Sequence, residues 1–182
     1  MSVEAIPGGK RRIDRILDPG FVAGVEGLEL DELRSRRSEA ETEEQSISYL
    51  RRMLQGRLDI LRAELVRRAS GGNRGTADLV AGLPGILSDA GPGSFTAVPR
   101  IRMPEPSNRQ RRRVERLVSD ETIARLPELE AEELNQVAEV LTREEEAVSI
   151  NRRAVQQVVD VLRGELTRRY RNGTASVAQL LE

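Results

Sequence analysis

Residues 44–59 read EQSISYLRRMLQGRLD, and residues 145–160 read EEAVSINRRAVQQVVD. Both stretches contain Glu, Ser, Arg, Gln and Asp in the same order and at the same spacings, E-x3-S-x2-R-x3-Q-x3-D. On an α-helix, at about 100° and 1.5 Å per residue, these five positions form one polar stripe about 80° wide and 22 Å long. An ordinary solvated face has no reason to repeat its residue types, so the repetition indicates a ligand-binding face.

The apolar residues of both stretches follow the helical period and form a packing seam about 100° away from the polar stripe. They are Ile47, Leu50, Leu54, Leu58, Leu61 and Leu65 in the first stretch and Val148, Val155, Val159, Leu162 and Leu166 in the second. Asn151 stands in this seam at the position equivalent to Leu50, and a single Asn in a seam commonly fixes register. Each helix is therefore expected to carry a polar strip beside a packed interface.

The repeat extends beyond the two motifs. A shift of 101 residues aligns residues 11–16 with 112–117, and the run Leu61 to Leu65 with Leu162 to Leu166. The sequence therefore predicts an all-α fold, a coiled coil of two long helices from a tandem duplication, with short flanking helices. A pseudo-two-fold axis perpendicular to the helices would make them antiparallel, but the roughly 60 residues between them allow either direction.

The predicted organisation follows this duplication. We expect a mobile N-terminus at 1–9, a first repeat at 10–89 with a long helix at about 31–68, a Pro/Gly linker at 90–108, and a second repeat at 109–182 with a long helix at about 131–171. Short amphipathic helices are expected at 10–17 and 109–118, and a weak amphipathic segment at 76–89.

Composition excludes several classes of function. Without histidine or cysteine, the chain offers no zinc site, thiol nucleophile or disulfide, and it lacks the commonest general base. The net charge of -1 argues against bulk attraction to nucleic acid or anionic lipid. No apolar run reaches the length of about 20 residues that a membrane span needs. We expect a cytoplasmic protein that is not an enzyme and holds no metal.

The residue types in the stripe suit guanine. Its O6 and N7 accept a bidentate arginine, here Arg51 or Arg152, and its N1–H and N2–H donors suit a carboxylate. Arg62 and Arg163 lie on the same stripe and are candidates for additional phosphate contacts. Alternatively, they pair locally with Asp59 and Asp160 at i,i+3 spacing.

The twin motifs resemble those of the RsiG family, actinobacterial anti-sigma factors that bind cyclic di-GMP. All ten motif positions match the family pattern, which makes them the expected ligand-binding residues: Glu44, Ser48, Arg51, Gln55, Asp59, Glu145, Ser149, Arg152, Gln156 and Asp160. The resemblance implies an antiparallel coiled coil that carries two cyclic di-GMP molecules. When loaded, such a protein sequesters a sporulation sigma factor of the WhiG type and represses its transcription in Streptomyces-like bacteria. Because both motifs lie in one chain, we expect a monomer before partner binding, and no direct DNA binding.

A second function class stays open, a passive coiled-coil scaffold or interaction protein without a nucleotide ligand. Glu44 and Glu145 lie in acidic runs that are typical of a solvated face. Ser48 and Ser149 also suit a space-filling role. A DNA-binding regulator is disfavoured by the charge balance and by the lack of a recognisable reading helix.

Overall fold

The computed structural model describes residues 9, 11–71, 125, 126 and 128–173. Regular structure in this part of the chain is entirely helical, which confirms the predicted all-α class. Its elements are α1 (Arg12–Ile16), the 3-10 turns η1 (Pro19–Phe21) and η2 (Val25–Gly27), and the long helices α2 (Leu30–Ala69) and α6 (Ala131–Arg171). The predictions for 1–8, 76–89, 90–108 and 109–118 lie outside the described residues.

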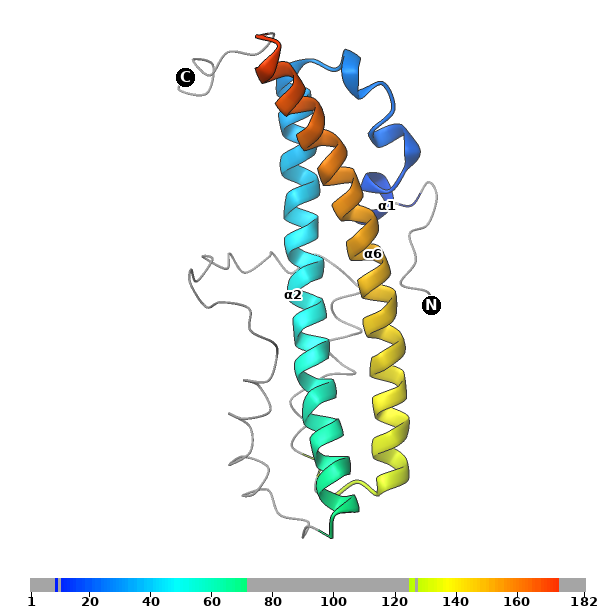
Figure 1. Cartoon of the computed structure of the whole chain (residues 1–182). Helices are drawn as coiled ribbons and strands as arrows, with labels where there is room; N and C mark the ends of the chain where they lie inside the picture. The colour runs from blue at the N-terminus through cyan, green and yellow to red at the C-terminus, as the bar shows by residue number, and fades with distance from the viewer. Residues whose placement is uncertain (1–8, 10, 72–124, 127, 174–182) are drawn as a thin grey trace. The chain divides into compact units, whose positions relative to one another are not determined.

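The two long helices pack against each other, as the sequence predicts, and run in opposite directions, as the family resemblance implies (Figure 1). α2 extends one residue beyond the predicted 31–68 at each end, and α6 has the predicted bounds. Within each helix buried apolar side chains recur every seven residues: Leu33, Ala40, Ile47, Leu54 and Leu61, and Leu134, Leu141, Val148, Val155 and Leu162. A strict heptad of this kind keeps one narrow seam facing the partner helix, which is the pattern of a coiled coil.

Both long helices carry residues that favour a helix start at one end and a helix stop at the other. Acidic residues stand in their first turns, Asp31 and Glu32 in α2 and Glu132 and Glu133 in α6, where they complement the positive end of the helix dipole. Past the C-terminal ends, Gly71 and Gly173 adopt φ angles of +78° and +69°. Glycine takes this left-handed conformation without steric cost, so the helices end where the sequence predicts.

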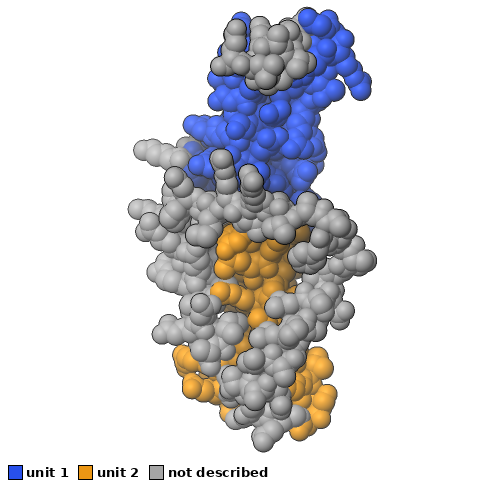
Figure 2. Space-filling model, turned by 90° about the vertical axis from the view of Figure 1, so that its left-hand side faces the viewer, with its two compact units in different colours: residues 1–48, 148–182 blue, residues 49–147 orange. Residues whose placement is uncertain are grey.

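The chain divides into two compact units, coloured separately in Figure 2. Unit 1 contains residues 1–48 and 148–182, and unit 2 contains residues 49–147. Each unit therefore takes one half of α2 and the antiparallel half of α6. The units do not coincide with the sequence repeats, because the antiparallel pairing combines the start of one repeat with the end of the other.

In unit 1 the N-terminal segment packs onto the helix pair. Ile13 and Ile16 of α1 and Phe21 of η1 are buried. Arg36 of α2 holds η1 in place, because its Nη1 donates to the Phe21 carbonyl at 2.7 Å and its guanidinium lies 5.6 Å from the centre of the Phe21 ring.

Candidate functional site

In unit 1 the second motif meets the first across the helix pair. Arg152 of α6 donates its Nε to Ser48 Oγ at 2.8 Å and to Glu44 Oε1 at 3.1 Å. Ser48 in turn donates to Glu44 Oε1 at 2.8 Å. Three motif residues therefore form a closed triangle, and Ser48 has a polar role in addition to filling space.

The same arginine also binds its own helix. Its Nη2 donates to Gln156 Oε1 at 3.3 Å, which fixes the side chain along the stripe. Ser149 is half-buried, and Asp160 at the far end of the motif is exposed. Unit 1 thus brings together Glu44, Ser48, Arg152 and Gln156, and leaves Asp160 open to solvent.

In unit 2 the first motif meets the second. Gln55 of α2 donates its Nε2 to Glu145 Oε1 of α6 at 3.0 Å. Asp59, one turn further along α2, is half-buried. Cross-helix pairing of motif residues therefore occurs in both units, with the roles of α2 and α6 exchanged.

Arg51 differs from its counterpart Arg152. Its Nε is buried and has no hydrogen-bond partner among the described residues. A buried N–H donor without an acceptor costs about 1–3 kcal/mol. Arg51 therefore holds a donor that an added acceptor would satisfy.

The flanking arginines do not form the local pairs that sequence spacing allowed. Arg163 reaches across to Glu41 of α2, with an N–O distance of 2.9 Å. Arg62 is exposed and forms no ion pair with Asp59 or with any other residue in the part of the chain that the structure describes. Their roles as phosphate contacts stay predictions.

In unit 1, α1 also contacts α2. Arg12 of α1 lies 3.8 Å from Glu43 of α2, and Arg15 pairs with Glu39. On the α2 wheel, Glu39 and Glu43 lie at least about 80° from Glu44 and the rest of the stripe. The N-terminal segment therefore contacts α2 away from the motif residues. Burial raises the pKa of Glu43, whose side chain is 6% exposed.

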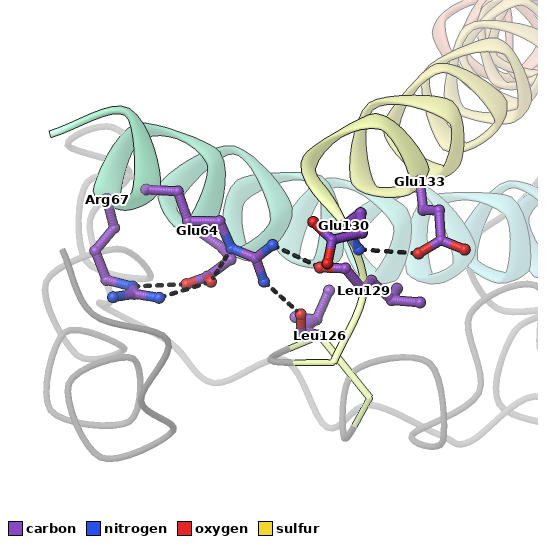
Figure 3. Close-up of polar contacts among 7 residues, drawn as sticks. Glu64, Arg67, Leu126, Leu129, Glu130 and Glu133 are labelled. Atoms are coloured by element: carbon purple, nitrogen blue, oxygen red, sulfur yellow. Dashed lines mark hydrogen bonds and ion pairs between the residues drawn. The ribbon is translucent and has the colours of Figure 1, made fainter. Parts of the chain in front are cut away.

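A further pair of polar clusters was not assigned a role from sequence. Each consists of a buried Glu and two arginines near the end of a long helix, Glu64 with Arg67 and Arg68, and Glu165 with Arg168 and Arg169. We call them the Glu–Arg–Arg clusters. In α2, the Nε–H of Arg68 donates to Glu64. Its Nη1 donates to the Leu129 carbonyl at 2.6 Å, and its Nη2 donates to the Leu126 carbonyl at 2.7 Å (Figure 3). These carbonyls belong to the turn that leads into α6.

The second cluster repeats this arrangement in unit 1. Arg169 donates Nε to Glu165 at 2.7 Å and Nη2 to the Val25 and Glu26 carbonyls, both at 3.1 Å. These carbonyls belong to η2, which leads into α2. The hydrogen bonds from Arg168 and Arg169 lower the pKa of Glu165 to about 2, and those from Arg67 and Arg68 lower the pKa of Glu64. The repeated Leu-Arg-x-Glu-Leu-x-Arg-Arg segment was the sequence signal for these clusters.

Two classes of site find no support in the part of the chain that the structure describes. Its Asp and Glu side chains form no group of three or more that could hold a metal ion. Its helices also include none with an apolar stretch long enough to cross a bilayer.

Comparison with protein families identifies a family that this chain matches. The model of the family described as RsiG-like matches residues 19–87 and 120–182, which include both long helices and both motifs. No curated protein matches the chain.

Proposed function

Because the chain belongs to the RsiG-like family and is thereby a regulator of the anti-sigma-factor type, we propose that it binds cyclic di-GMP and, when loaded, sequesters a sporulation sigma factor of the WhiG type. The family match extends over both long helices and accounts for the class of regulator. The nucleotide, and the sigma factor of the WhiG type, are the parts that we propose here.

The observation that carries the nucleotide proposal is the unfilled donor of Arg51. Its buried Nε lacks an acceptor among the described residues, while the neighbouring motif residues Gln55 and Glu145 already bind each other. The O6 and N7 atoms of guanine accept two parallel hydrogen bonds from an arginine, so a guanine at this position would satisfy the donor. The residues present therefore fit a guanine nucleotide.

The carboxylates of the stripe explain why guanine fits better than a bare phosphate. Glu44, Asp59, Glu145 and Asp160 would repel a phosphate but accept hydrogen bonds from guanine N1–H and N2–H. The arginines Arg51 and Arg152 would then bind the acceptor edge of guanine and offset the repulsion between phosphates. Two stripes in one chain suggest two cyclic di-GMP molecules per chain.

We assign the site to binding and not to catalysis. Ser48 donates its hydroxyl hydrogen to Glu44 and accepts from Arg152, so it is held within the polar triangle. The sequence contains no histidine or cysteine that would serve as a base or nucleophile. The ligand is therefore proposed to act as a signal that the protein does not consume.

Titration calorimetry of the full chain with cyclic di-GMP tests the proposal, with cyclic di-AMP as the matched control nucleotide. We expect two cyclic di-GMP molecules per chain and no binding of cyclic di-AMP, whose adenine N6 presents a donor where guanine O6 presents an acceptor. One cyclic di-GMP per chain would contradict the stoichiometry, and equal binding of both nucleotides would contradict guanine recognition.

One observation supports the passive scaffold as the alternative. Gln55 and Arg152 donate hydrogen bonds to motif glutamates of the opposite helix, so part of the motif also stabilises the helix pair. The same calorimetry separates the two functions, because a scaffold gives no heat with either nucleotide.

A further inference from the structure

The two copies of the motif differ in charge at a flanking position that lies on the polar stripe. The shift of 101 residues that superposes the motifs places Glu41 of the first repeat opposite Thr142 of the second. Both residues stand three positions before the motif glutamate, at the edge of the polar stripe. The duplication therefore keeps the motif but changes the charge at this flanking position.

In unit 1 the flanking arginine is neutralised. Glu41 lies 2.9 Å from Arg163 of α6 and 3.7 Å from Arg37 of its own helix. The motif arginine of this unit, Arg152, is also paired, at 3.1 Å from Glu44. An anionic ligand that approaches these arginines has to share them with carboxylates or displace the carboxylates.

In unit 2 the equivalent arginines have no carboxylate partner among the residues that the structure describes. Thr142 carries no charge and donates its hydroxyl to the Ala138 carbonyl of its own helix at 2.8 Å. Arg62, the counterpart of Arg163, forms no ion pair with any residue that the structure describes. Arg51, the counterpart of Arg152, has the unfilled Nε.

From this difference we infer that the two half-sites bind nucleotide in a fixed order. The half-site in unit 2, with Arg51 and Arg62, takes the first guanine nucleotide, and the half-site in unit 1, with Arg152 and Arg163, takes the second. The inference rests on the proposed function. Its physical basis is that a ligand in unit 2 fills an empty donor, whereas a ligand in unit 1 competes with Glu41 and Glu44.

Nuclear magnetic resonance of the arginine Nε–Hε groups tests the order directly. The signals of Arg51 and Arg152 are assigned with Arg51→Lys and Arg152→Lys, and the wild-type chain is titrated with cyclic di-GMP. We expect the Arg51 signal to change at a lower ratio of nucleotide to protein than the Arg152 signal. Simultaneous changes, or an earlier change at Arg152, would overturn the inference.

Exchanging the flanking residues Glu41 and Thr142 tests whether the charge at this position sets the order of binding. Glu41→Thr removes the competing carboxylate from unit 1, and we expect binding in that unit to tighten about fivefold, the worth of an exposed ion pair of about 1 kcal/mol. Thr142→Glu places a carboxylate beside Arg62 and should weaken binding in unit 2 by a similar factor. Gln136→Glu is the matched control, because it adds the same charge to α6 about 120° away from position 142.

A second pair of variants changes the flanking arginines and leaves Glu41 and Thr142 as they are. It therefore tests the order of binding independently of the carboxylates. Arg62→Gln should weaken the first binding step, whereas Arg163→Gln should leave the first step unchanged. Far-ultraviolet circular dichroism checks that each variant stays helical. If cyclic di-GMP binds but neither the exchange nor these variants alter the order, the inference fails and the proposed function stands. If calorimetry detects no nucleotide binding to the wild type, the proposed function fails first.

Discussion

At the residue scale, one residue type in one repeated motif has two environments. Arg152 is paired with Glu44 and Ser48, while the Nε of Arg51 is buried without an acceptor among the residues that the structure describes. The sequence predicts both arginines as ligand-binding residues because it repeats them at equal spacing. It does not predict which of them is already satisfied, because that depends on atoms of the opposite helix.

The first prediction concerns Arg51→Ala. We expect this variant to lose cyclic di-GMP affinity by roughly 5- to 150-fold, because one bidentate arginine–guanine contact is worth about 1–3 kcal/mol. Its stability without ligand should be unchanged or slightly increased, because a buried unsatisfied donor is removed. Calorimetry measures the first effect and thermal unfolding the second.

Arg52→Ala is the matched control for this variant. Arg52 is the exposed neighbour of Arg51 on the same helix, so its loss should alter neither nucleotide affinity nor melting temperature. A marked loss of stability in Arg51→Ala without ligand would show that Arg51 is structural and would contradict the prediction.

The second prediction concerns Glu43. Burial raises the pKa of this carboxyl above its ordinary value of 4.5, so between 4.5 and the raised value the folded chain binds more protons than the unfolded chain. Stability then decreases as the pH rises through this window, and the charged carboxylate destabilises the fold at pH 7. Glu43→Gln should therefore raise the melting temperature at pH 7 and remove this part of the pH dependence.

Glu146→Gln is the control, since Glu146 is an exposed carboxylate of α6, whereas the charge of Glu39 itself raises the pKa of Glu43. Glu146→Gln should not raise the melting temperature at pH 7. A lower melting temperature for Glu43→Gln than for the wild type would show that the contact with Arg12 outweighs the cost of burial.

At the scale of elements, the sequence predicts the long helices almost completely. The heptad of apolar residues, the acidic first turns and the terminal glycines are local signals, and they all agree for α2 and α6. The Glu–Arg–Arg clusters show where such reasoning stops. Arg68 and Arg169 bind backbone carbonyls, and every residue has a carbonyl, so no side-chain pattern identifies the acceptor.

The third prediction follows from these clusters. Arg169→Ala removes the hydrogen bonds that hold η2 against the end of α6, and we expect it to lower the free energy of unfolding by about 1–3 kcal/mol. Equilibrium unfolding in urea measures the change.

Arg168→Ala is the matched control. Arg168 binds the same Glu165, but its side chain is 54% exposed, against 14% for Arg169. No hydrogen bond from Arg168 to a backbone carbonyl is found among the described residues, so its removal should cost clearly less. Equal losses in the two variants would mean that Glu165, and not the carbonyls of η2, accounts for the effect of Arg169.

At the scale of the whole molecule, the duplication places both motifs in one chain. The sequence predicts this arrangement because the motifs recur with their seams and flanking segments. It does not predict that the two halves differ, although the exchange of Glu41 for Thr142 is visible in the alignment of the repeats. The structure shows why this difference matters, because Glu41 accepts a hydrogen bond from Arg163 across the helix pair.

The fourth prediction concerns the proposed switch. A nucleotide favours the complex with the sigma factor only by its differential affinity for the bound and free protein. By the same linkage, the sigma factor must tighten nucleotide binding by the same factor. Capture of a WhiG-type sigma factor on the immobilised chain, with and without cyclic di-GMP, measures the first effect, and nucleotide titration of the preformed complex measures the second. Equal capture in both conditions would leave no role for the nucleotide as a switch.

Variants of the motif aspartates separate this switch from folding. Asp160 is exposed, Asp59 is half-buried, and neither forms an ion pair with a residue that the structure describes. Asp59→Ala and Asp160→Ala should therefore keep the circular dichroism and melting temperature of the wild type while they abolish nucleotide-dependent capture. If either variant captures the sigma factor as well as the wild type does when cyclic di-GMP is present, that aspartate does not bind the ligand, and its guanine-binding role has to be assigned to the remaining carboxylates of the polar stripe.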